Sequence, residues 1–336
     1  MTANKNVKRL VRARAQRTGE TYTAALQQVR EQRAIGGPLR LAVAQLPVEQ
    51  DATDPVALRR AGNRLRAAVR EAAASGARVV QLPEGATCFP GKRVLSSTGP
   101  DVVGPADWGR VAWDVLDAEL AETAALAGRL GVWVVLGSTH RLSAGRRPHN
   151  CLYVVGDDGR VRTRYDERYL SHTKATWMYS PGHAPVVAEV DGWRLGLALG
   201  LETHFPEVFA EYDGLDVDAV LFSSTGDGDL DATTFAVEAA GHAAVHGFWV
   251  GFAVPPQAGP GAGVVSPGGR WATRATGDGS GRDDVVVVDL DRTDPDVAVA
   301  RTLARPWRRR VGREGHRDLL DDGLVQDVRS VERAAF

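Results

Sequence analysis

Short apolar runs alternate with longer amphipathic stretches along most of this chain, and the alternation limits the folds it can adopt. Pro55–Ala74, Val111–Leu130 and Thr233–His246 carry apolar residues at helical spacing. The apolar runs between them have the length of strands. Strands that alternate with helices favour an α/β fold in which the helices pack on the outer faces of sheets.

Two tight turns show that the predicted sheets are mixed. We expect strands at Leu41–Leu46, Val79–Leu82, Val132–Leu136, Cys151–Val155, Arg160–Arg164, Val186–Val190, Trp193–Leu199, Ala219–Ser223, Phe248–Val254, Gly263–Ser266, Arg270–Thr273 and Val285–Leu290. Asp157-Asp158-Gly159 and Asp191-Gly192 each separate two of these runs and predict hairpins. Because hairpins pair strands antiparallel and strand–helix–strand units pair them parallel, both kinds of pairing are expected.

The first 36 residues differ from the rest and predict two short helices. The second helix is indicated by Tyr22, Ala25, Leu26 and Val29, which recur on one helical face, with Thr21 as its N-cap. Residues 1–36 hold eight Lys or Arg and two Glu, although the whole chain has a net charge of −1. The rest of the chain is therefore acidic, and the segment is a basic extension that ends in a Gly-Gly-Pro linker.

Composition excludes several classes of protein. The chain has 336 residues, of which 43% are hydrophobic and 25% charged, as in ordinary globular proteins. We find no apolar run long enough to cross a membrane and no apolar stretch after the basic start that would make it a secretory signal. Cys88 and Cys151 are too few for a disulfide scaffold or a cysteine-based zinc site. A reducing, cytoplasmic setting is expected.

Three segments, in this order, carry a family resemblance. They are Leu82-Pro83-Glu84-Gly85 at the end of a predicted strand, residues 165–170 after a hairpin, and residues 200–207 at another strand end. Together with the strand at Asn150 and the turn at residues 179–182, they resemble the nitrilase, or carbon–nitrogen hydrolase, superfamily. The resemblance covers about residues 39–290.

This resemblance implies a domain organisation as well as a fold. The implied fold is a four-layer αββα sandwich that dimerises through a helical face. We expect the sandwich at residues 39–292, between the helical extension at residues 1–36 and a polar, Arg-rich tail at residues 293–336.

The same resemblance assigns catalytic roles, and most are unfilled here. In the family, a glutamate acts as general base, a lysine stabilises the oxyanion, a cysteine attacks the amide or nitrile carbon, and a second glutamate supports them. The general base falls on Glu84. The lysine position holds Glu167, the cysteine position holds Gly200 and the second glutamate position holds Ala175. Glycine has no side chain that could attack a carbon atom. Glu167 places a negative charge next to the oxygen on which the reaction develops another, so the family's mechanism cannot operate.

Neighbouring residues offer weak replacements for the lost groups. Cys88 is an alternative nucleophile, although we expect it to be packed beside Phe89, and Cys151 is expected in the core. Residues 223–225 (Ser-Ser-Thr) are expected to form a turn. Lys174 could swing inward and supply the missing cation, but we expect it to be a solvated loop lysine.

A rebuilt site is the other chemical possibility. Glu84 and Glu167 face each other if the family geometry persists, and two close carboxylates can serve as acid and base. Glu202, His204 or His172 could add metal ligands. No spacing matches a known ligand signature, so we expect no metal and no cofactor. Glu202 and His204 are expected to be structural polar partners around the turn.

These observations leave two main functional hypotheses. The first is a binding or regulatory pseudoenzyme, a homodimer, with residues 1–36 as the element that recognises a protein partner. The second is a divergent hydrolase, or another enzyme, in which Glu84 is the general base and water, Cys88 or a metal completes the site. Nucleic-acid binding through residues 1–36 is a distant third, since aromatic residues are almost absent there. No membrane partner is expected, and the sequence does not define a small-molecule ligand.

Overall fold

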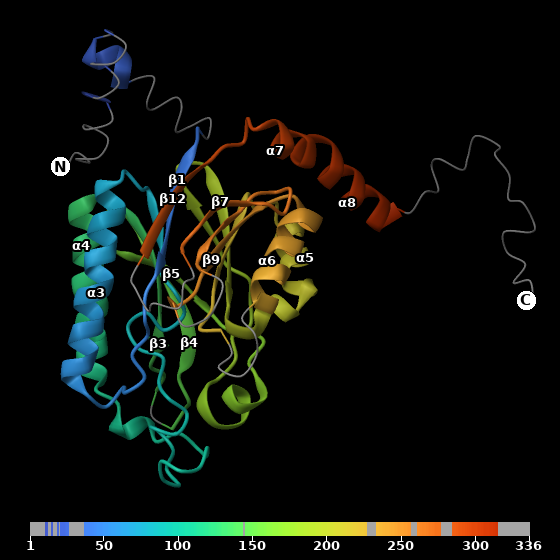
Figure 1. Ribbon diagram of the computed structural model, residues 1–336. Coiled ribbons are helices and arrows are strands. Elements are labelled where there is room, and N and C mark those ends of the chain that lie inside the picture. The colour runs from blue at the N-terminus through green and yellow to red at the C-terminus, as the bar shows by residue number, and fades with distance from the viewer. Residues whose placement is uncertain are drawn as a thin grey trace, which may run out of the picture.

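Two six-stranded mixed sheets pack face to face, with helices on the outer face of each (Figure 1). The computed structural model describes residues 11, 12, 15, 19, 21–26, 37–143, 145–226, 233–256, 261–276 and 284–314. The first sheet has the order β12-β1-β2-β3-β4-β5 and the second β11-β10-β9-β8-β7-β6. The layers form the α/β sandwich that the sequence predicts.

The strands lie close to their predicted positions. They are β1 (Leu39–Gln45), β2 (Val79–Gln81), β3 (Trp133–His140), β4 (His149–Val155), β5 (Val161–Asp166), β6 (Val187–Val190), β7 (Trp193–Leu199), β8 (Ala219–Ser223), β9 (Trp249–Ala253), β10 (Gly263–Val265), β11 (Trp271–Arg274) and β12 (Asp284–Leu290). Within the sheets, β1–β2–β3 and β7–β8–β9 pair parallel, whereas β3–β4–β5 and β6–β7 pair antiparallel. Both kinds of pairing are present, as the turns predict.

The helices cover the two sheets from opposite sides. They are α3 (Pro55–Ala74), α4 (Trp113–Leu130), α5 (Pro206–Gly214), α6 (Thr233–His246), α7 (Pro295–Val299) and α8 (Arg305–Glu314). Figure 1 shows α3 and α4 on the first sheet and α5 and α6 on the second. Three shorter helical segments are η1 (Trp108–Arg110), η2 (Lys174–Met178) and η3 (Gly200–His204), and η5 (Ala300–Ala304) joins α7 to α8. No helix among the described residues combines the length and the hydropathy that a bilayer crossing requires.

Side-chain alternation along β1 explains how the layers are held together. Leu41 and Val43 pack into the core that includes residues of both sheets, whereas Ala42 and Ala44 pack toward α3 and α4. Successive strand residues point to opposite faces, so a strand covered on both sides must be apolar at every position. The small alanines face the helices and the larger residues fill the space between sheets.

One arginine ties the two hairpin turns to each other. Arg78, which precedes β2, donates from Nε to Asp191 Oδ2 at 2.6 Å and from Nη2 to Asp157 Oδ2 at 2.9 Å. Asp157 lies in the turn of the first sheet and Asp191 in that of the second. The guanidinium therefore links the sheets at the edge where both turns lie.

Two helical regions are not predicted from the sequence. The helix α5 was not predicted, because its apolar residues are few and it starts within the motif of residues 200–207. Residues 293–336 were expected to be a polar tail, but residues 295–314 are largely helical, and Arg305 is only 2% exposed. Arg305 Nε donates to Asp213 Oδ1 of α5 at 3.0 Å. This segment is Arg-rich, as predicted, and its arginines bind acidic residues of the two-sheet body.

Only part of the basic extension is described. Thr21 Oγ1 accepts a hydrogen bond from the backbone N–H of Ala24 at 3.3 Å, as expected of an N-cap. Val11 and Ala25 are buried against each other, with Ala15 and Leu26 beside them. The rest of the two predicted helices lies outside the described residues.

A buried ion pair between the outer helices predicts a stability difference between two neighbouring acids. Arg66 of α3 is within 2.5 Å of Glu119, whose side chain is 5% exposed, and within 3.1 Å of Glu122, whose side chain is 62% exposed. Glu119→Ala removes the buried partner of Arg66 and leaves only the exposed Glu122 as its counter-charge, and should lower the free energy of unfolding by about 3 kcal/mol. The matched Glu122→Ala should lower it by less than about 1 kcal/mol. Denaturant unfolding of both variants measures this, and equal losses would contradict it.

Candidate functional site

The candidate site forms where several strands end between the two sheets. Glu84 follows β2, Glu167 follows β5, Gly200 follows β7 and Thr225 follows β8, while Asn150 lies within β4. Parallel strands bring their carboxyl ends to one edge, and this places side chains from distant segments together. The sandwich therefore assembles the site from residues that are up to 141 positions apart.

Polar contacts across the sheets fix the position of Glu84. Gln81 Nε2 donates to the carbonyl oxygens of Phe222 at 2.8 Å and of Gly251 at 3.2 Å in the second sheet. Ser223 Oγ donates to the Leu82 carbonyl oxygen at 2.9 Å. These bonds hold the end of β2 against the end of β8. The following glutamate is consequently delivered to the space between the sheets.

A buried ammonium group joins two carboxylates in this space. Lys174 Nζ lies 2.6 Å from Glu84 Oε1 and 2.8 Å from Glu167 Oε2. Asn150 Nδ2 donates to the same two oxygens, at 2.7 Å and 2.6 Å. The exposed fractions are 1% for Glu84, 0% for Glu167, 6% for Lys174 and 1% for Asn150. We call these four residues the Lys174 network.

Backbone groups satisfy the remaining carboxylate oxygens. The Thr225 N–H donates to Glu84 Oε2 at 2.8 Å, and its hydroxyl lies 3.2 Å from the same oxygen. The Leu201 N–H donates to Glu167 Oε1 at 3.4 Å. All four carboxylate oxygens thus have protein donors. A buried polar cluster satisfied in this way is stable without a ligand.

Burial and charge shift the pKa values within the Lys174 network. Burial raises the pKa of Glu167 to about 7, against the opposing effect of the Lys174 ammonium, and the nearby Glu84 carboxylate raises it further. Burial disfavours the Lys174 ammonium, but the two carboxylates outweigh it and hold its pKa above the usual range. Lys174 is therefore protonated at neutral pH. One positive charge faces two carboxyl groups, of which one titrates near neutrality.

Gly200 occupies a backbone position that has no room for a side chain. Its φ is +66°, in the left-handed region that glycine adopts without strain. A Cβ atom at this position would lie 2.2 Å from Glu167 Oε1 and 2.8 Å from Lys174 Nζ. The space next to Gly200 is therefore filled by the charged groups of the Lys174 network.

The structure corrects the sequence prediction for two adjacent residues. Lys174 was expected to be a solvated loop lysine, and this is wrong, because its side chain is buried in the network. Ala175 was assigned to the position of the second glutamate, but it is exposed, and its neighbour enters the site instead. The segment η2 is a π-helix, in which the backbone N–H of Tyr179 bonds to the carbonyl oxygen of Lys174, five residues earlier, and this changes the direction in which successive side chains point. Residue spacing alone could not show which of the two points inward.

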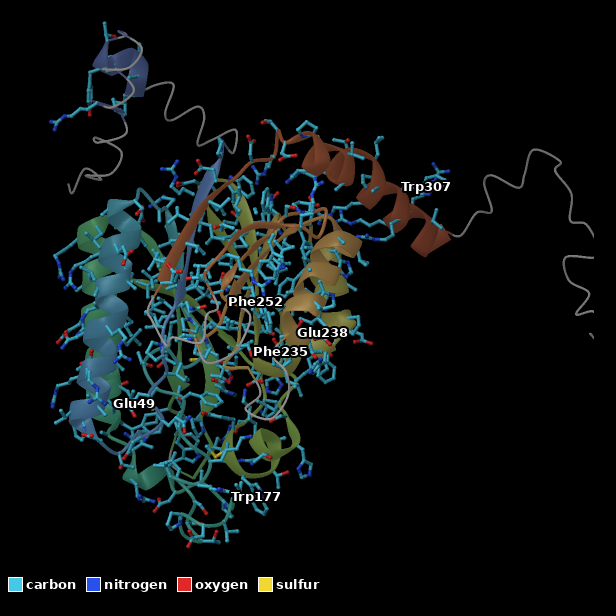
Figure 2. All side chains as sticks on the ribbon, viewed as in Figure 1. Glu49, Trp177, Phe235, Glu238, Phe252 and Trp307 are labelled. Carbon is cyan, nitrogen blue, oxygen red and sulfur yellow. The ribbon has the colours of Figure 1, made fainter. Side chains whose placement is uncertain are left out.

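Glu202 and His204 both bond to other residues of the protein. Glu202 accepts hydrogen bonds from the Tyr165 hydroxyl at 2.6 Å and from the backbone N–H groups of Leu199 at 2.8 Å and Arg168 at 2.7 Å. It ties the end of β7 to the segment after β5. His204 Nδ1 lies 2.7 Å from Glu238 Oε1 of α6, and Figure 2 shows Glu238 on the side of the second sheet.

The other candidate nucleophiles and metal ligands stand apart from the network. Cys88 is 1% exposed in an apolar cluster with Leu58, Leu95 and Tyr179, and burial raises the pKa of its thiol. Cys151 is fully buried in the core. His172 is exposed. In the parts of the chain that the structure describes, no three His, Cys, Asp or Glu side chains are grouped as metal ligands would be.

Two contacts of Glu84 were not predicted as site contacts. Asn150 is part of the resemblance alone, and residues 223–225, which follow a strand that borders the family's pocket, are expected to form a turn rather than to supply a nucleophile. Asparagine within an otherwise apolar strand is an unusual choice, because a buried amide needs partners. That signal could have placed Asn150 in the site. For Thr225 the signal was its position just after a strand that borders the family's pocket.

Comparison with known proteins identifies what the chain resembles. The sequence model described as carbon-nitrogen hydrolase matches residues 40–294. An amidase from Nesterenkonia sp. is similar in structure, with 20% sequence identity, a TM-score of 0.62, and coverage of 81% of this chain and 97% of that one. A mutant of the Nesterenkonia AN1 amidase from the nitrilase superfamily has 18% identity, a TM-score of 0.63, and coverage of 81% and 99%. A search of curated proteins gives no match.

A further structure of the amidase from Nesterenkonia sp. AN1 shows what its cysteine does. In that mutant the acetamide moiety of fluoroacetamide is added covalently at the active-site cysteine. It shares 19% identity with this chain, with a TM-score of 0.62 and coverage of 82% and 97%. At such identities the likeness concerns the fold.

Loss of the central ammonium should destabilise the protein strongly. Lys174→Met leaves two buried carboxylates without a cation, and we expect the free energy of unfolding to fall by about 3–5 kcal/mol at pH 8. Lys92→Met, at a partly exposed loop position, is the control and should change it by less than about 0.5 kcal/mol. Denaturant titration at fixed pH compares them. Similar stability of the two variants would mean that the network contributes little.

Glu167 should make stability depend on pH in a defined direction. Its pKa is about 7 in the folded protein against an ordinary 4.5, so between these values the unfolded chain binds fewer protons. The contribution of Glu167 to the free energy of unfolding of the wild type therefore falls as the pH rises from about 4.5 to 7, and then levels off. Glu167→Gln mimics the protonated acid. It should match the wild type near pH 4.5 and exceed it by about 3 kcal/mol at pH 8.

Unfolding curves of wild type and Glu167→Gln across this pH range measure the effect. The exposed Glu189→Gln serves as control, and its difference from wild type should not rise in the same window. A Glu167→Gln variant that is less stable than wild type at pH 8 would show that the ionised carboxylate stabilises the fold.

Proposed function

Because the chain belongs to the carbon-nitrogen hydrolase family, we propose that it is a member that acts by binding and does not hydrolyse amides or nitriles through a thiol. The observation that carries this proposal is Gly200, which stands at the position that the resemblance assigns to the cysteine. Without a side chain there, no acyl group can be held covalently. The protein would then work as a binding or regulatory pseudoenzyme.

The occupation of the site supports the proposal. The carboxylate of Glu167 and the ammonium of Lys174 fill the volume that a side chain at position 200 would enter. A nucleophile and the carbonyl group it attacks need that volume. In addition, every oxygen of Glu84 and Glu167 has a protein donor, so the cluster is complete without a substrate.

The distribution of charge also argues against an oxyanion site. A tetrahedral intermediate needs positive charge or N–H donors directed at the developing negative oxygen. Here the one ammonium group of the network is already shared by two carboxyl groups. A new negative charge placed beside Glu167 would be repelled rather than stabilised.

Binding through the outer surfaces is consistent with a homodimer. The exposed face of α6 carries Val237 and Val245, which are 66% and 60% exposed, with Gly241 between them. A Cβ at Gly241 would meet no atom within 4 Å, so this face is open. We assign the dimer contact to this face and partner recognition to residues 1–36. The proposed setting is the cytoplasm, where the two cysteines, both free thiols, stay reduced.

A second candidate function is a hydrolase with a rebuilt site, and one contact favours it. The Thr225 hydroxyl lies 3.2 Å from Glu84 Oε2, within reach of a general base, and Thr225 is only partly buried. Glu84 could deprotonate this hydroxyl or a water molecule that replaces it. The same hydroxyl also lies 3.2 Å from the Gly226 carbonyl oxygen, which competes for its proton.

A combined assay of turnover and acylation tests the proposal. Ammonia release from a panel of amides, nitriles and N-carbamoyl compounds is measured for wild type, Glu84→Gln, Thr225→Val and Cys88→Ala. Intact mass is measured after incubation with fluoroacetamide, with the Nesterenkonia amidase as the positive control. We expect background ammonia and no acetamide adduct for all four proteins.

Each departure from this result has a distinct meaning. Turnover that is lost in Glu84→Gln would overturn the proposal and establish a rebuilt hydrolase. If it is also lost in Thr225→Val, the hydroxyl is the nucleophile. If the adduct forms on wild type and not on Cys88→Ala, the buried thiol is reactive. Turnover that persists in Glu84→Gln would mean a contaminant or a site elsewhere.

A further inference from the structure

The helix near the end of the described chain presents its arginines inward and its apolar residues outward. Residues 295–314 form α7, η5 and α8 in succession (Figure 1). Arg305 and Arg309 bind Asp213, and Arg301 binds Asp218, so these cations face the body. A surface helix normally buries its apolar stripe and exposes its charges. This segment instead directs three arginines at the body and exposes several apolar residues, although Val297 is buried and Arg310 is exposed.

The outward residues follow helical spacing. Val299, Leu303 and Trp307 recur every four residues and are 57%, 66% and 47% exposed. Figure 2 shows Trp307 on α8 at the edge of the molecule. Arg310 lies near the Trp307 ring, its guanidinium 5.6 Å from the ring centroid. We call Val299, Leu303 and Trp307 the apolar stripe. A row of large, exposed apolar side chains indicates a binding surface.

The residues that follow α8 in the sequence have the complementary pattern. Leu320, Leu324, Val328 and Val331 recur at the spacing of one helical face. Residues 315–336 hold five acidic residues and three arginines, whereas residues 295–314 hold six arginines and two acidic residues. The two segments thus match in apolar spacing. Arg301, Arg305, Arg308 and Arg309 already bind acidic residues of the body, whereas Arg310 lies beside Trp307 and can face an acidic segment.

Chain length permits the two patterns to meet in register. If the chain reverses near Gly315, Trp307 lies opposite Leu324, Leu303 opposite Val328, and Val299 next to Val331. Eight residues of helix span about 12 Å, so both rows cover the same distance. The short connection also gives the segment a high effective concentration at the stripe, which an external partner lacks.

We propose that residues 318–332 of the same chain dock on the apolar stripe as an antiparallel partner of α7–α8. Such a short segment with Gly323 at its centre would gain its order from this contact, since isolated short helices are marginal. The contact would in turn cover the stripe. The occupant is therefore the chain's own C-terminal segment, not a second copy, a membrane or another protein.

Cysteine pairs test the proposal in the full chain. Both native cysteines are buried, so introduced thiols can be followed with little background. Leu303→Cys/Val328→Cys is oxidised mildly, with Val56→Cys/Val328→Cys as the matched control, because Val56 is 69% exposed on the distant α3. We expect a disulfide within one chain in the first variant, formed about tenfold or more faster than in the control.

The alternative results each overturn the proposal. A disulfide between two chains, with a rate that rises with protein concentration, would assign the stripe to a second copy. Equal rates in both variants would mean that residue 328 has no preference for the stripe. As an independent result, we expect maleimide to label the thiol at position 303 faster in the Leu303→Cys/Val328→Asp double variant than in the Leu303→Cys single variant. Unchanged labelling would show that the segment does not cover residue 303.

Discussion

The position of one buried ammonium group between two carboxylates determines what the centre of this molecule can do. Lys174 brings together strand ends from both sheets, because Glu84 follows β2 and Glu167 follows β5. A buried ion cluster stabilises only when its geometry satisfies each charge, and here Asn150 and two backbone N–H groups complete it. The same contacts fill the space next to Gly200, where a Cβ atom would meet Glu167 and Lys174.

The remaining polar groups of the region are organised around this cluster. Glu202 ties the end of β7 to the segment that carries Glu167, and Gln81 joins the sheets behind Glu84. Neither residue needs a ligand, since each is bound within the protein. The unusual features outside this region are the exposed apolar residues of α6 and of the α7–α8 segment.

Much of the fold was predictable because its determinants are local. The alternation of apolar residues and the Asp-Gly turns placed the β-hairpins and the helix Pro55–Ala74. The positions of Glu84, Glu167 and Gly200 in the site followed from the resemblance. Lys174 was misjudged because its inward direction depends on a π-helical turn, which residue spacing does not reveal. The helix at residues 305–314 was hidden for a related reason: its arginines find acidic partners about 90 positions away, which makes a polar pattern pack.

The left-handed backbone at Gly200 has a consequence for any attempt to place a nucleophile at this position. Cysteine at this position alone would strain the backbone and collide with Glu167 and Lys174. Lysine at position 167 alone would place two cations together, and glutamate at position 174 alone would gather three carboxylates. Each single step toward an active arrangement is therefore unfavourable, and only a concerted exchange avoids the barrier.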